Sequence, residues 1–111
     1  MIDMSARSSA GSVARFPTIV NMTMTLADTE YEYELPENCK SFIIHTRDES
    51  AFRFAYETGY VATPVEPYFT VPATKALGDD DFLNYTHGGV RVTLYFASGS
   101  AGKVIEIIHW T

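Results

Sequence analysis

Apolar and polar side chains alternate along most of the chain from Phe16 onward. Successive side chains of a strand point to opposite faces, so a period of two predicts strands with one buried face. Five stretches show this period: TIVNMTMTL at 18–26, EYEYEL at 30–35, SFIIHTR at 41–47, AFRFAYE at 51–57 and VRVTLYF at 90–96. We expect the core to receive Val20, Met22, Met24, Leu26, Tyr31, Tyr33 and Leu35 from the first two.

The last stretch, KVIEIIHWT at 103–111, is apolar on both faces. Val104, Ile108 and Trp110 share one face with Glu106, and Ile105, Ile107 and His109 share the other. A strand covered on both sides is either central in a sheet or buried at a subunit contact. The candidate interface residues are therefore Ile105, Ile107, His109 and Trp110.

Turn-forming residues separate these runs, as in LPEN at 35–38, ETGY at 57–60 and ASGSAGK at 97–103. Three prolines within 61–73 predict an edge or an irregular connection, and 73–84 is the only segment suited to a short helical turn. Seven or eight short strands separated by turns predict an all-β fold. We expect an antiparallel β-sandwich, jelly-roll-like or Ig-like.

The first residues differ from the rest because serine, alanine and glycine give them little to bury. We expect a flexible N-terminal arm at 1–14, or an arm that lies across a neighbouring subunit, followed by one β-sandwich domain at 15–111. A chain of 111 residues is long enough for one core and too short for two.

The net charge of -6 disfavours nucleic acid and anionic membranes as ligands, because both require concentrated positive charge. No stretch approaches the roughly 18 apolar residues of a membrane span. The N-terminus has no continuous apolar segment typical of a secretory signal, so synthesis in the cytoplasm is the expectation.

Three acidic side chains, Glu30, Glu32 and Glu34, alternate with apolar ones and form an acidic comb. On a strand they point the same way, about 7 Å apart per step. Calcium usually takes six to eight oxygens from a converging loop, which a flat row does not provide. We interpret the comb as a solvated or partner-facing stripe.

No other residues form a recognisable catalytic or metal motif. GDDDF at 78–82 lacks the spacing of an EF-hand, and His45, His87 and His109 form no ligand pattern. Cys39 is the only cysteine, so a nucleophile would require His45 or His109 beside it in space. We therefore expect no catalytic residue, no metal and no cofactor.

The seven tyrosines and Trp110 leave a second interpretation open. Aromatic faces can stack on sugars, and tyrosine joins an apolar ring to a polar hydroxyl. The alternative function is thus a small β-sandwich binding module that recognises a glycan or a receptor through exposed aromatic residues.

The order of these pieces resembles a group of small all-β virion proteins of tailed bacteriophages. The resemblance rests on an alternating strand ending in LP, on AFRFA, YFTVPA and DDDFL, and on the closing GVRVTLYFASGSAGKVIEIIHWT, and it covers roughly 25–111. It implies a non-enzymatic structural component, located in the virion after synthesis in the host cytoplasm. Such proteins decorate capsids, form collars or fibre bases, or join head to tail. The implied partners are other copies of the chain, as a trimer or a higher ring, and other virion proteins.

Overall fold

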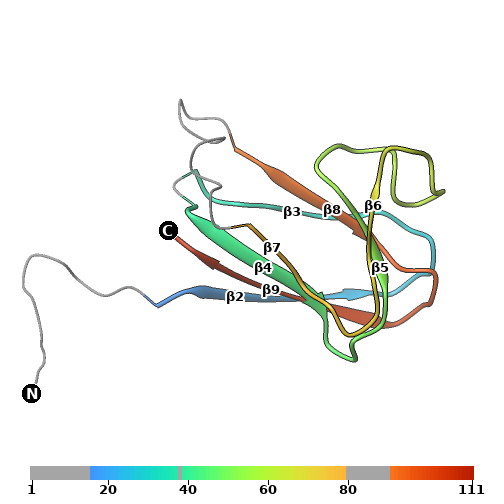
Figure 1. The fold of residues 1–111 in the computed structure, drawn as a ribbon, viewed down its shortest axis with the longest axis horizontal. Coiled ribbons are helices and arrows are strands. Elements are labelled where there is room, and N and C mark those ends of the chain that lie inside the picture. The colour runs from blue at the N-terminus through green and yellow to red at the C-terminus, as the bar shows by residue number, and fades with distance from the viewer. Residues whose placement is uncertain (1–15, 38, 80–90) are drawn as a thin grey trace, which may run out of the picture.

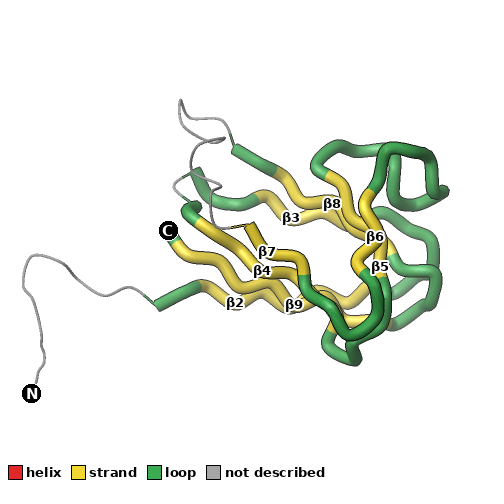
Figure 2. The backbone as a smooth tube through the Cα atoms, viewed as in Figure 1, coloured by secondary structure: helices red, strands yellow, loops and turns green. Residues whose placement is uncertain are grey.

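The computed structural model describes residues 16–37, 39–79 and 91–111, which form eight β-strands and no helix (Figure 1). The strands are β2 (Thr18–Met24), β3 (Tyr31–Glu34), β4 (Ser41–Thr46), β5 (Phe52–Ala55), β6 (Phe69–Val71), β7 (Leu77–Asp79), β8 (Thr93–Ala97) and β9 (Lys103–Trp110). Figure 2 shows them as two layers joined by loops. The all-β prediction is confirmed for the part of the chain that the structure describes.

The strands form two antiparallel sheets of four. One, the β9 sheet, has the order β2-β9-β4-β7, and the other, the β8 sheet, has the order β3-β8-β5-β6. Each step from one described strand to the next changes sheet, except the step from β5 to β6. Strand β9 lies between β2 and β4; one of its apolar faces, with Ile105 and Ile107, is buried in the core, and the other, with Val104 and Ile108, is half-buried on the outer face of the sheet.

The inward faces of both sheets share one core. Phe42 and Ile44 of β4 are fully buried, as are Leu94 and Phe96 of β8. The rings of Phe42 and Phe54 lie 6.5 Å apart between centroids and join the two layers. The full cluster comprises Met24, Leu35, Cys39, Phe42, Ile44, Phe52, Phe54, Val71, Leu94, Phe96, Ile105 and Ile107. The two sheets therefore pack face to face.

Two details of the sequence interpretation are wrong. Leu26 is 61% exposed because β2 ends at Met24 and the chain then turns. The segment 73–84 is suited by its sequence to a short helical turn, but at 77–79 it forms edge strand β7, where Leu77 and Gly78 pair with Ile44 and Ile43; its residues 80–84 lie outside the described part of the chain. The proline-rich segment does give an irregular connection and then edge strand β6, as predicted.

Several predictions fall outside the described residues. These are the arm at 1–14, most of GDDDF at 78–82, and His87.

Candidate functional site

The predicted interface residues of β9 divide between the two faces of its sheet. Ile105, Ile107 and His109 are at most 3% exposed and point into the chain's own core. Their assignment to a subunit interface is therefore wrong, because the partner that covers them is the β8 sheet of the same chain. Trp110 lies on the other face and is half-buried.

The three glutamates of the acidic comb have different surroundings. The carboxylate of Glu30 accepts hydrogen bonds from the Thr58 hydroxyl at 2.6 Å and from the Gly59 N–H at 2.9 Å. Glu32 is exposed, and Glu34 is exposed with its carboxylate 3.9 Å from the Arg91 guanidinium. The outward direction of Glu32 and Glu34 matches the prediction, whereas Glu30 holds a loop. A partner for this stripe stays a prediction.

Cys39 and His109 are both buried near one end of the core. The Cys39 thiol donates to the Ser41 carbonyl at 3.3 Å, and burial raises the pKa of this thiol. The Nε2 atom of His109 is hydrogen-bonded to the Tyr33 hydroxyl at 2.9 Å, and burial lowers the pKa of the imidazole. No hydrogen bond joins the thiol to the imidazole among the contacts of the described residues.

His45 lies on the opposite face of the β9 sheet from His109, so the two histidines do not form a pair. Its Nε2 is 3.1 Å from the Glu106 carboxylate, which also accepts a hydrogen bond from Arg47 at 2.7 Å. The Arg47 hydrogen bond is the main reason that the pKa of Glu106 is lowered. Within the described ranges, no three His, Cys, Asp or Glu side chains are grouped to hold a metal ion.

A long loop covers the outer face of the β8 sheet and is fixed there at several points. We call residues 56–68 the anchored loop. Val61 is fully buried and packs with Ala55 and Ala97, whose small side chains leave room for it. Arg53 donates to the carbonyls of Val61 at 2.6 Å and Ala62 at 3.2 Å. With the Glu30 bonds at Thr58 and Gly59, these contacts hold the loop in place.

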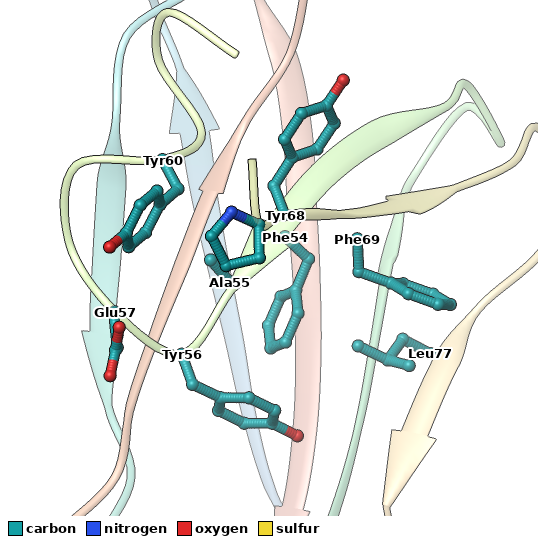
Figure 3. A pocket seen from close by; sticks show the side chains of 9 residues that line it. Phe54, Ala55, Tyr56, Glu57, Tyr60, Tyr68, Phe69 and Leu77 are labelled. Carbon is teal, nitrogen blue, oxygen red and sulfur yellow. The ribbon is translucent and has the colours of Figure 1, made fainter. Parts of the chain in front are cut away.

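An open pocket lies where this loop meets strands β5, β6 and β7. Its volume is about 470 Å³ and its surface is mainly apolar. The lining residues are Phe54, Ala55, Tyr56, Glu57, Tyr60, Pro67, Tyr68, Phe69 and Leu77, which we call the aromatic pocket (Figure 3). In that view Tyr60 and Glu57 lie on one side of Phe54, and Phe69 and Leu77 lie on the other.

The aromatic pocket offers accessible ring surface to a ligand. Tyr56 is 46% exposed and Phe69 is 56% exposed. The Tyr56 ring is held edge-on against Phe54, with the ring centroids 5.0 Å apart. The volume falls within the roughly 300–1,000 Å³ that is common for small-molecule sites.

Sequence reasoning singled out the tyrosines without locating this pocket. The available signal was the density of aromatic and proline residues in FAYETGYVATPVEPYF at 54–69. That density could not show that Leu77, on the other sheet, completes the lining, because this depends on how the two sheets are placed.

Fold and pocket together define a two-sheet, all-β protein with a solvent-open aromatic pocket. No protein-family model, curated protein or solved structure matches the chain. Among the residues that the structure describes, no helix is suited to crossing a membrane.

Proposed function

We propose that this protein is a non-enzymatic structural component of a tailed-phage virion. It oligomerises and docks on capsid or head–tail proteins, in a decoration, collar or fibre-base role. The observation that carries the proposal is the strand order, β2-β9-β4-β7 against β3-β8-β5-β6. Jelly rolls are eight-stranded double sheets, and they occur in viral capsid and lectin domains.

The strand order supports a jelly roll over an Ig-like sandwich. An Ig domain places several consecutive strands, such as A and B, in the same sheet. Among the strands that the structure describes, only β5 and β6 are consecutive and share a sheet. The sequence resemblance of the closing segment to phage virion proteins supports the same proposal.

Apolar residues on the outer face of the β9 sheet support docking on another subunit or virion protein. Ile108 pairs with Ile19 on one side and with Ile43 on the other, forming a row across three strands. Ile19 is 67% exposed and Ile43 is 39% exposed. We call Ile19, Ile43 and Ile108 the isoleucine row.

Light scattering of the purified protein and mass spectrometry of purified phage particles test the proposal. We expect an oligomer in solution and the chain in particles, with its position found by electron microscopy. Replacement of Ile19 by Asp should weaken assembly, whereas Thr23→Asp, exposed on the same strand, should not. A monomer that is absent from particles would contradict the proposal.

A second candidate function is favoured by the aromatic pocket, namely recognition of a glycan or a protein receptor. Aromatic rings that are accessible and held in place can contribute contact area at low entropic cost. We expect binding of the cognate ligand to be lost in Phe69→Ala and kept in Phe16→Ala, since Phe16 is 97% exposed and is not part of the pocket. A glycan array and a receptor screen without hits would remove this candidate.

A further inference from the structure

We propose that the aromatic pocket receives a guanidinium group, the arginine side chain of another protein. This inference takes the second candidate function as its basis and specifies the chemistry of the ligand.

Accessible aromatic rings supply the first part of the recognition. Tyr56 is 46% exposed, Phe69 is 56% exposed and both line the pocket, while Tyr60 lines it from the anchored loop. A cation over the face of a tyrosine or phenylalanine is attracted by the ring quadrupole, and arginine makes this contact more often than lysine. Its planar guanidinium also stacks on rings, which an ammonium group cannot do. The aliphatic stem of the arginine can pack on Leu77.

The charge of the lining supplies the second part. Glu57 is the one charged residue among the nine that line the pocket. Glu66, next to the lining residue Pro67, is also exposed. A carboxylate can accept two parallel N–H bonds from a guanidinium, which fixes the orientation of the ligand. With a net charge of -6, the whole chain also favours a cationic partner over an anionic one.

The anchored loop keeps this arrangement in place before a ligand arrives. Glu57 and Tyr60 flank the two residues, Thr58 and Gly59, that the Glu30 carboxylate holds. The next residue along, Val61, is buried, and its carbonyl is bonded to Arg53. A site that is already ordered loses less conformational entropy when it binds.

The geometry favours a guanidinium over a sugar. Recognition of a sugar requires several polar groups that converge on its hydroxyls, because buried hydroxyls without partners are costly. Figure 3 shows the hydroxyls of Tyr56, Tyr60 and Tyr68 pointing in different directions. One carboxylate beside several rings matches one flat cation better than it matches a polyhydroxyl ring.

NMR titration of the full ¹⁵N-labelled chain with N-acetyl-arginine amide tests the inference. The matched probe is N-acetyl-citrulline amide, which keeps the shape of arginine and removes its charge. We expect arginine to bind in the millimolar range and to shift the amides of 54–57, 60, 68, 69 and 77. Citrulline should bind about tenfold more weakly, since it loses both the cation–π contact and the ion pair.

Two glutamate-to-glutamine variants distinguish the effect of the pocket carboxylate on arginine binding from the effect of the chain's net charge. Glu57→Gln should weaken arginine binding by about 3- to 10-fold, a range that follows from losing one partly exposed charge-assisted bond. Glu32→Gln removes the same charge from an exposed position of β3 and should leave binding unchanged. Because Glu57 is exposed, its replacement should not impair folding.

Equal binding of arginine and citrulline, or unchanged binding in Glu57→Gln, would overturn the inference. Tighter binding of methyl glycosides than of arginine at the same amides would also overturn it, while leaving the second candidate function in place. Absence of the chain from phage particles would contradict only the virion proposal.

Discussion

The hydrogen bond between Tyr33 and His109 is a part-buried polar contact that adjoins the apolar core. His109 is 3% exposed, and its Nδ1 atom has no hydrogen-bond partner among the described residues. The rings are also in contact, with centroids 5.6 Å apart. An unpartnered buried nitrogen destabilises the folded state, so this pair sits where small changes should have measurable effects.

Replacing Tyr33 by Phe should destabilise the protein by about 1–3 kcal/mol, because Nε2 of His109 then loses its partner as well. The double variant Tyr33→Phe/His109→Leu should lose less stability than the sum of the two single variants, since both polar groups are then gone. Urea unfolding of the four proteins measures this. Tyr31→Phe is the control, because among the described residues its hydroxyl accepts a hydrogen bond from the exposed Leu26 N–H. Additive effects would show that the Tyr33–His109 contact contributes little.

Burial lowers the pKa of His109, and this sets the sign of a pH effect. The unfolded chain, with a His pKa of about 6.5, binds a proton that the folded chain resists. Stability should thus be complete above about pH 6.5 and fall as the pH drops from there through the lower folded pKa. Unfolding curves between neutral and mildly acidic pH should show this fall in stability in the wild type and in His45→Gln. In His109→Leu the fall in stability should be smaller. An unchanged slope in His109→Leu would contradict the assignment.

At the scale of elements, the start of strand β3 lies against the anchored loop. Its neighbour Glu30 is hydrogen-bonded to Thr58 and Gly59, and Gly59 has a φ of 101°, which suits glycine in the turn. Arg53 of β5 holds the following carbonyls of Val61 and Ala62. Glu30, directly before β3, and Arg53 of β5 thus hold the anchored loop, which supplies much of the lining of the aromatic pocket.

Glu30→Ala should loosen the anchored loop, and Glu32→Ala should not. For Glu30→Ala we expect faster hydrogen exchange at 58–62, because two hydrogen bonds to its carboxylate are removed. We also expect its free energy of unfolding to fall by about 0.5–1.5 kcal/mol. The exposed Glu32 should change stability by no more than about 0.5 kcal/mol. Hydrogen exchange detected by mass spectrometry measures the first effect, and urea unfolding measures the change in stability. Identical exchange in the two variants would mean that Val61 and Arg53 suffice to hold the loop.

At the scale of the whole molecule, the contact between the two sheets is the main source of stability. The two sheets share one main core that draws on β2, β4, β5, β6, β8 and β9. A chain of 111 residues buries a limited apolar surface, so domains of this size have a small stability margin. Substitution of a core residue should therefore lower the free energy of unfolding far more than substitution of an outward residue of the same strand.

Ile44 and Ile43 are adjacent in β4 and test this directly, since Ile44 is fully buried and Ile43 is 39% exposed. Ile44→Ala should destabilise the chain by about 2–5 kcal/mol through lost burial and a cavity. Ile43→Ala should cost less than about 1 kcal/mol in the monomer. Chemical denaturation monitored by Trp110 fluorescence gives both values. Similar losses would indicate that the outer face of the β9 sheet is also covered, as the virion proposal expects of an oligomer.

The period-two pattern was sufficient to locate most strands and their inward faces. Met24, Leu35, Phe42, Ile44 and Phe96 are all buried as their alternation predicts. The pattern failed at Leu26, where the strand ends first, and at Leu77, where three residues are too few for a period to show. Short edge strands depend on their neighbours rather than on their own sequence.

By itself the sequence determined an all-β chain and the face on which each strand residue lies, because the pleat ties side-chain direction to position. It did not determine which strands are neighbours. Only the tertiary structure decided that Ile105 and Ile107 of β9 are buried in the core of this chain, and that Glu30 is hydrogen-bonded to Thr58. The aromatic pocket likewise depends on two sheets meeting at Phe69 and Leu77. These features join residues far apart in the chain, and local alternation carries no information about such distances.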